Sequence, residues 1–159
     1  MDCGQTLWQF YEGELGAPDV RALLDHHFAE MCADSPPEAC HVLPIDGLDD
    51  PAIRLISLRD GSGRLLGVGA LKALDPDHGE IKSMRTHRQA LGMGVGKAIL
   101  AELIKLARTA GMTRLSLETG NSALFAAANR LYEGAGFVRC GPFGGYLPTD
   151  FTHFYTREI

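Results

Sequence analysis

Apolar and polar residues follow two different periods along this chain, so the sequence predicts both helices and strands. Apolar residues at every third or fourth position predict amphipathic helices at residues 18–33 and 94–110. Ser122 is a candidate N-cap for a third helix, which ends before Gly136. Alternation at every second position, with turn residues between the runs, predicts strands near residues 6–11, 52–58, 65–74, from about 80, 114–118, 137–140 and 153–158.

The composition of the 159 residues narrows the class of protein. An apolar content of 45% suits one globular domain that spans residues 1–159. The formal charge of -5, without a basic cluster, argues against a nucleic-acid surface and suits a cationic amine as substrate. There is no membrane-length apolar run and no leader pattern, so we expect no membrane partner and a cytoplasmic protein. The cysteines, expected as reduced thiols because no C-x-x-C pair occurs, are Cys3, Cys32, Cys40 and Cys140.

A glycine-rich loop between a predicted strand and a predicted helix is the strongest candidate for a binding site. Residues 91–97 read LGMGVGK. Glycines let the main chain approach a ligand, and the first turn of a helix offers free N–H groups and a positive dipole end, so a phosphate-bearing ligand is expected. A P-loop would need glycine at Leu91 and serine or threonine at Ala98, and a dinucleotide site would need the spacing G-x-G-x-x-G. Neither pattern fits.

A second motif completes a resemblance to a known family. Residues 128–137 carry the pattern A-x-x-L-Y-x-x-x-G-F. The glycine loop followed by this pattern resembles the two motifs of the GNAT superfamily of acetyl-CoA-dependent N-acetyltransferases. The resemblance covers at least residues 79–140. The sequence looks like a small bacterial branch of that superfamily. The resemblance implies a mixed α/β fold, with a central and mostly antiparallel sheet, flanking helices, and splayed strands at the cofactor site.

The resemblance also implies acetyl-CoA as acetyl donor. The family loop reads (Gln or Arg)-x-x-G-x-(Gly or Ala), and Leu91 replaces the Gln or Arg when Gly94 and Gly96 are aligned. A register that starts at Gln89 restores the Gln but moves the glycines; we prefer the first, because Val95 then begins the apolar pattern of the helix. The residues expected at the cofactor are Met84, Arg85, Thr86, Leu91, Gly92, Met93, Gly94, Val95, Gly96, Lys97, Asn121 and Ala128.

The attacking amine needs a base. An alkylammonium group has a pKa near 10.4, so only about one amine in a few thousand is neutral at pH 7. The family motif assigns the base to Glu80, which could also be a surface carboxylate or a partner of Lys82. Strand alternation would place Glu80, Lys82, Met84 and Thr86 on one face. Glu118, at the end of the next strand, is the rival base.

Further residues follow from the same resemblance. Tyr132 matches the tyrosine that protonates the departing CoA thiolate, and a backbone N–H near Met84 would stabilise the oxyanion. Phe125 occupies the place of a usual asparagine, whose contact with the pantetheine Asn121 could take over, although Asn121 could equally be a turn residue. The acceptor pocket is expected in loops that carry Glu38, His41, Tyr146 and Asp150, for which ordinary loop polarity is an equal alternative.

These features predict an N-acetyltransferase that acts on a primary amine of a small amine, an amino acid or a peptide N-terminus. The sequence holds neither metal-ligand spacing nor a nucleophile motif, so a metal is not expected and direct transfer is favoured over an acyl-enzyme. A non-catalytic acyl-CoA sensor is the alternative, although it would need neither Glu80 nor Tyr132. A sheet edge near the C-terminus could form a homodimer.

Overall fold

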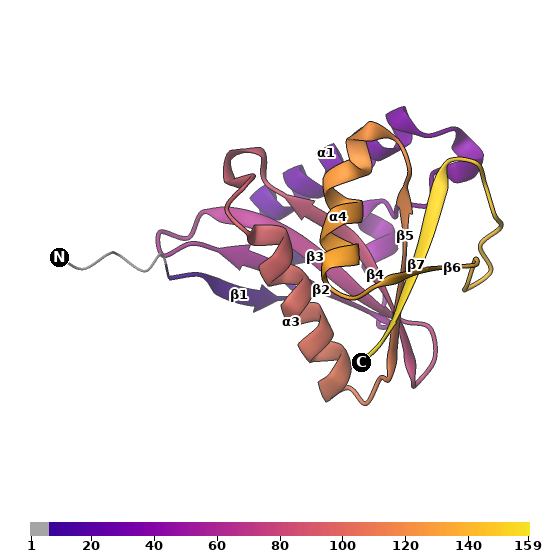
Figure 1. Cartoon of the computed structure of the whole chain (residues 1–159). Helices are drawn as coiled ribbons and strands as arrows, with labels where there is room; N and C mark the ends of the chain where they lie inside the picture. Colours follow the sequence, from indigo (N-terminus) through magenta and orange to yellow (C-terminus); the bar gives the residue numbers. More distant parts are fainter. Residues whose placement is uncertain (1–6) are drawn as a thin grey trace.

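A seven-stranded sheet forms the centre of the computed structural model, which describes residues 7–159 and, of Glu38, only the backbone. The strand order is β1-β2-β3-β4-β5-β7-β6 (Figure 1). Only β4 and β5 pair in parallel, so the predicted mixed and mostly antiparallel sheet is confirmed. The strands are β1 (Gln9–Glu12), β2 (Ile53–Arg59), β3 (Leu65–Ala73), β4 (His78–Thr86), β5 (Arg114–Gly120), β6 (Val138–Cys140) and β7 (Thr152–Glu158). Thr6 of the first predicted strand and Cys3 lie outside the described residues.

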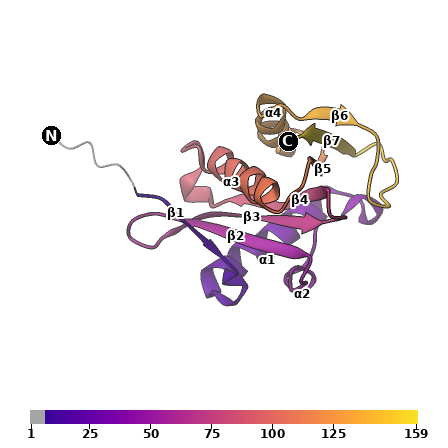
Figure 2. The same ribbon diagram turned by 90° about the horizontal axis from the view of Figure 1, so that it is seen from below.

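Helices cover both faces of the sheet. α3 (Val95–Thr109) and α4 (Ala126–Gly134) lie on one face, and α1 (Pro18–Asp34) and α2 (Ile45–Leu48) lie on the other (Figure 2). The two long helices agree with the prediction to within one residue at each end, whereas the single turn α2 was not predicted. Within residues 7–159, no helix combines the length and the apolar character needed to cross a bilayer.

Each face of the sheet has its own apolar core. On the α3 face, Ile99, Leu100 and Leu103 are almost completely buried against the strands. On the α1 face, Val20 and Leu24 pack with apolar residues of α2, β2 and β3. Full burial of one such side chain stabilises the fold by about 1.5–3 kcal/mol. The two cores therefore hold α1 and α3 at fixed positions on opposite faces of β4.

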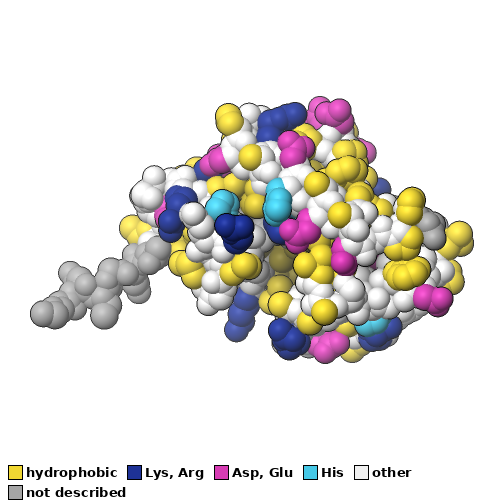
Figure 3. All heavy atoms as spheres, turned by 90° about the horizontal axis from the view of Figure 1, so that it is seen from above, with side chains coloured by type: hydrophobic (Ala, Val, Ile, Leu, Met, Phe, Trp, Pro, Cys, Tyr) yellow, Lys and Arg dark blue, Asp and Glu magenta, His cyan; other side chains and the backbone are white. Residues whose placement is uncertain are grey.

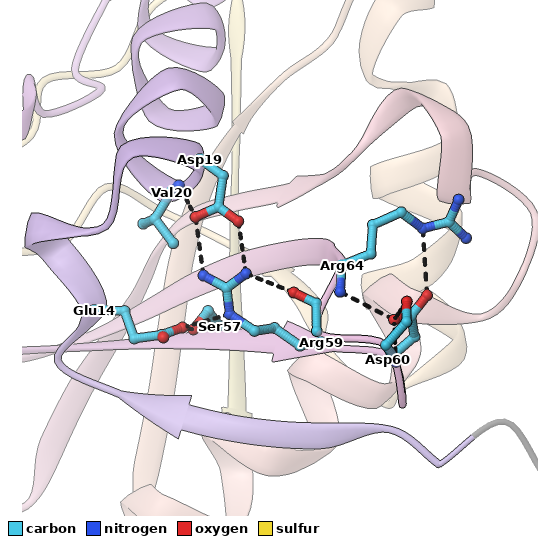
Figure 4. A network of polar contacts seen from close by, with 9 residues as sticks. Glu14, Asp19, Val20, Ser57, Arg59, Asp60 and Arg64 are labelled. Carbon is cyan, nitrogen blue, oxygen red and sulfur yellow. Dashed lines mark hydrogen bonds and ion pairs between the residues drawn. The ribbon is translucent and has the colours of Figure 1, made fainter.

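A polar network anchors the first turn of α1 to the sheet (Figure 4). Arg59 of β2 donates two hydrogen bonds to Asp19, of 2.6 and 2.9 Å, and one of 3.0 Å to Glu14. The Arg59 guanidinium holds the pKa of the Asp19 carboxyl below its usual value. Asp19 also lies in the first turn of α1, where the helix dipole favours a negative charge. This contact fixes one end of α1, whose other end borders the cavity described below.

β4 and β5 separate halfway along their length. They pair from His78 with Arg114 to Ile81 with Leu117, while β4 continues to Thr86 and β5 to Gly120. Beyond Ile81, the side of β4 that faces β5 therefore has no strand partner among the described residues. The predicted splay of the central strands is confirmed.

A bulge in β4 changes which side chains share a face. Val68 pairs with Arg85 and Ala70 with Lys82, so two steps along β3 match three along β4, and Ser83 has a φ of 53°. Met84 consequently packs into the core on the α3 face, while Arg85 reaches Glu30 of α1. The expectation that Met84 shares a face with Glu80 and Lys82 is wrong, because the extra residue reverses the alternation.

Two local predictions are corrected near the end of α1. Cys32 and Cys40 form a disulfide, so the expectation of reduced thiols is wrong for this pair, while Cys140 is free. The chain reverses after α1 and brings the two Cα atoms to 5.3 Å, a proximity that cysteine spacing alone does not reveal. Ser122 does not cap α4: its hydroxyl donates to Asp34, and a 3-10 turn (Ala123–Phe125) precedes the helix.

Candidate active site

A cavity of about 210 Å³ lies where β4 and β5 separate. Its walls come from the unpaired ends of both strands, the second half of α1, the segment 39–43, α4 and Tyr146. Viewed from above, the molecule shows acidic, basic and histidine side chains close together among apolar ones (Figure 3). The splay thus brings residues from distant parts of the sequence to one cavity.

Glu80 is the centre of a buried polar cluster. Its side chain is only 3% exposed. Lys82 Nζ donates to Glu80 Oε1 at 2.8 Å, and the Tyr146 hydroxyl donates to the same oxygen at 2.6 Å. Lys82 Nζ also donates to the Tyr146 hydroxyl at 2.8 Å. Burial and the contact with Glu80 raise the pKa of Tyr146 well above its ordinary value. Glu80 therefore forms an ion pair with the buried Lys82. This contact is the alternative partner that the sequence analysis considered for Glu80.

Glu118 faces the same cavity from β5 and has a different environment. Its partner is Nδ1 of His41, whose ring lies 4.9 Å from the ring of Tyr146, centroid to centroid. Burial raises the pKa of the Glu118 carboxyl above its ordinary value of 4.5, and the hydrogen bond to His41 opposes this shift only in part. Glu80 and Glu118 therefore line the same cavity in different surroundings, and burial raises the pKa of Glu118.

α4 brings Tyr132 to the wall of the cavity. The ring packs against Phe137 and Tyr155, and the side chain is 6% exposed. Burial raises the pKa of the Tyr132 hydroxyl, which therefore keeps its proton at neutral pH. Ala128, one turn earlier, also lines the cavity. Phe125 lines it as well and packs so closely on Gly120 that a Cβ there would overlap the ring.

The glycine loop leads directly into α3. The helix begins at Val95, as the preferred register requires, and Gly94 precedes it with a φ of 85°. Within the described chain, the N–H groups of Val95, Gly96 and Lys97 have no main-chain acceptor. A Cβ at Gly96 would lie 3.3 Å from the Leu131 side chain of α4, so a larger residue there would require Leu131 to shift slightly. The loop presents donors suited to an anion.

Other predicted residues differ in their relation to the cavity. Met84, Arg85, His41 and Tyr146 line it. Asn121 and Asp150 are exposed and lie outside it, because the Asn121 amide donates to the carbonyl of Asp150 and joins two loops. These contacts support the turn reading of Asn121. Glu38 was predicted to line the acceptor pocket, but its side chain is outside the part of the chain that the structure describes. The remaining residues predicted in the glycine loop are exposed around the start of α3; they are Leu91, Gly92, Met93 and Lys97. Thr86 of β4 lies beside Gly96.

Several cavity residues had no signal in the sequence. Glu30 of α1 accepts two hydrogen bonds from Arg85, of 3.1 and 2.9 Å. Ser83 at the bulge and His27 of α1 also line the cavity. The α1 residues could have been found only by knowing which face of β4 this helix covers. Among the described side chains, no group of three or more His, Cys, Asp or Glu residues is placed to hold a metal ion.

Comparisons with known proteins agree with this geometry. Residues 6–137 match the acetyltransferase (GNAT) family. The chain is 42% identical to an uncharacterized N-acetyltransferase, YsnE, of Bacillus subtilis (strain 168) over 146 residues, which are 92% of this chain and 96% of that protein. A crystal structure assigned as an acyl-CoA N-acyltransferase of Klebsiella pneumoniae superposes with a TM-score of 0.75 at 23% identity, over 96% of this chain and 97% of the other.

A further solved structure carries a bound ligand. A GNAT family acetyltransferase of Elizabethkingia anophelis, solved with acetyl-CoA, superposes with a TM-score of 0.65 at 18% identity, over 96% of this chain and 98% of that one. The fold is thus shared with a protein that binds the expected donor. From the family match and the close relative, the chain belongs to the acetyltransferase (GNAT) family and is an acyltransferase.

Proposed function

We propose that this protein transfers the acetyl group of acetyl-CoA directly to a primary amine bound in the cavity between β4 and β5. The observation that carries the proposal is that Glu118, a carboxylate with a raised pKa, and Tyr132, a phenol that stays protonated, line the same cavity. These groups match the two proton transfers of the reaction. The family match favours this enzyme over a non-catalytic sensor.

The chain offers two surfaces suited to acetyl-CoA. The free N–H groups at the start of α3 would hold the pyrophosphate, with Lys97 nearby as a solvent-exposed cation. The side of β4 that lacks a strand partner after Ile81 would bind the pantetheine amides as an added strand, along Met84, Arg85 and Thr86. When bound, the donor supplies the activated thioester.

Glu118 would take the proton that the ammonium group must lose. The amine nitrogen then forms a bond to the acetyl carbon as the bond from carbon to sulfur breaks, and Tyr132 gives its proton to the departing sulfur. Glu80 is less suited to the role of base, because Lys82 and Tyr146 both donate hydrogen bonds to its Oε1. Glu80 instead positions Lys82 and Tyr146 beside the acceptor.

Direct transfer is supported by the state of the cysteines. Cys40 is the cysteine that lines the cavity within residues 7–159, and its sulfur is bonded to Cys32. Cys140 has a free thiol but does not line the cavity. The described part of the cavity therefore offers no thiolate to carry the acetyl group, and the amine itself must attack the thioester.

The test is amine-dependent release of the CoA thiol from acetyl-CoA by the purified chain, with the acetylated product identified by mass. A panel of small amines, amino acids and short peptides supplies the acceptors, and a sample without amine is the control. Release with a matching mass gain of one acetyl group supports the proposal. Binding of acetyl-CoA without transfer to any acceptor counts against it, and absence of binding rules out the donor.

A further inference from the structure

Two buried polar atoms in the cavity lack a hydrogen-bond partner among the described residues. They are Nδ1 of His27 and Oγ of Ser83, and each residue is 8% exposed. Both residues line the cavity, whereas the third such atom, Nε1 of Trp8, belongs to a residue outside it. A buried polar atom without a hydrogen-bond partner lowers the stability of the fold by about 1–3 kcal/mol. Two such atoms in residues that line one cavity therefore indicate that a polar group of a ligand binds there.

Two of the three carboxylates that line the cavity pair with an arginine or a lysine. Glu30 contacts Arg85 and Glu80 contacts Lys82, whereas Glu118 contacts the ring of His41. A plain alkylammonium ion could pair with Glu118 but would leave the polar atoms of Ser83 and His27 without a partner. A ligand with both an ammonium group and a carboxylate would add no net charge and could satisfy groups of both signs.

The partner for an ammonium group and the partners for a carboxylate lie at different positions along β4. Because Ile81 pairs with Leu117, Glu118 is level with Lys82, and Ser83 is one residue further along β4. Arg85 follows after the bulge, within reach of Glu30 on α1. Arginine has five N–H donors. In Arg85, two of them bond to Glu30, so the others remain for a second carboxylate.

His27 completes this end of the cavity without adding a charge. Burial, with a smaller effect of Arg85, lowers the pKa of His27 to about 4, so the imidazole is neutral at pH 7. Its free Nδ1 offers a hydrogen bond beside the guanidinium. Ser83, His27 and Arg85 therefore offer polar groups to the same cavity as the carboxylates Glu80 and Glu118.

We infer that the acceptor is an amino acid, or another primary amine that carries a carboxylate, with its ammonium group at Glu118 and its carboxylate bound by Ser83, Arg85 and His27. This inference rests on the proposed function, because it names the acceptor of the same reaction. The carboxylate would use the two orphaned polar atoms, and the ammonium group would lose its proton to the desolvated base.

The test is calorimetric binding to the full chain saturated with CoA, which supports no turnover. Each amino acid is compared with the amine made by removing its carboxylate: tyrosine with tyramine, lysine with cadaverine, histidine with histamine, and serine with ethanolamine. The Ser83→Gly variant removes the hydroxyl and accommodates the φ of 53°. Arg85→Gln is the second variant. Ser116→Ala is the matched control, because this buried serine of β5 bonds to His78 and Thr156 and does not line the cavity.

We expect at least one amino acid to bind tenfold or more tightly than its amine. Ser83→Gly and Arg85→Gln should each weaken that binding at least fivefold, and Ser116→Ala should change it less than twofold. Equal or tighter binding of the amines, no binding of any amino acid, or unchanged binding in both cavity variants would overturn the inference. Preferential binding of an amino acid without acetyl transfer would support this inference and contradict the proposed function. Acetylation of plain amines alone would support the proposed function and contradict this inference.

Discussion

The Tyr146 hydroxyl donates a hydrogen bond of 2.6 Å to Glu80, a residue 66 positions earlier in the chain. This contact ties the loop between β6 and β7 to the middle of the sheet. Lys82 Nζ bonds to both groups, and His41 packs against the Tyr146 ring. The loop therefore closes one side of the cavity through one tyrosine.

Replacing Tyr146 with phenylalanine should impair binding of the acceptor more than binding of the donor. The variant keeps the ring but removes one donor to Glu80 and one acceptor for Lys82. We expect the KM for the acceptor to rise at least fivefold and the KM for acetyl-CoA to change less than twofold, measured by CoA release. An equal rise of both constants would contradict this division of the cavity.

Replacing Tyr132 with phenylalanine should slow turnover and leave CoA binding intact. The ring would keep its packing with Phe137 and Tyr155, and only the proton donor would be lost. We expect kcat to fall at least tenfold, while calorimetry gives a CoA affinity within twofold of the original. Tyr155→Phe is the control, because its hydroxyl bonds to Asn129 and Glu133 outside the cavity. If Tyr132→Phe turned over at the original rate, another group would be the acid.

His27 should make the folded state sensitive to mild acid. Its pKa is about 4 when folded and 6.5 ordinarily, so the unfolded chain binds the proton more readily. The stability present above pH 6.5 is lost as pH falls toward 4, by an amount on the order of 3 kcal/mol. Arg85 and His26, which face the same imidazole, lower its pKa further, and Glu30 opposes this shift.

Urea unfolding between pH 7 and 4 measures this dependence. The matched variant is His27→Gln, which keeps a polar side chain but cannot titrate, and its curve should be flatter over this interval. Parallel curves for the two proteins would show that His27 is not buried as described. Other acidic groups contribute equally to both proteins, so the difference between the curves isolates the imidazole.

Much of the fold follows from local sequence patterns. Helix α3 has a continuous apolar face, and the first half of α1 buries Val20, Leu23 and Leu24. The strands of the β2–β3 hairpin are separated by the Asp60 to Gly63 turn, where three hydrogen bonds from Ser62 and Arg64 reach the Asp60 carboxylate. These features involve neighbours in sequence. The family motif similarly identified the start of α3 and the position of Tyr132, since both belong to single segments.

The parts that sequence patterns missed depend on long-range packing. The bulge at Ser83 arises from the pairing of β4 with β3, and it moved Met84 to the opposite face from the expected one. The disulfide of Cys32 and Cys40 depends on how the chain reverses after α1. The contact of Glu30 with Arg85 depends on which helix covers β4. None of these has a local signature.

The disulfide should help to hold His41 at the acceptor end of the cavity. Cys40 directly precedes His41 and lines the cavity itself. We expect Cys40→Ser to raise the KM for the acceptor about fivefold without changing the KM for acetyl-CoA, because the loop that carries His41 loses its link to α1. Cys140→Ser is the control, as this free cysteine does not line the cavity. Identical acceptor constants in the two variants would show that the link does not position His41.

The most direct test of the account is the pH dependence of kcat/KM with the best acceptor, for the original protein and for Glu118→Gln and Glu80→Gln. The original protein should lose activity toward acid with an apparent pKa above the ordinary glutamate value of 4.5, as burial of Glu118 requires. Glu118→Gln should lose this acid limb and about 100-fold in rate. Glu80→Gln should keep the limb and lose less than tenfold. The reverse pattern, with the limb abolished only by Glu80→Gln, would contradict Glu118 as the base.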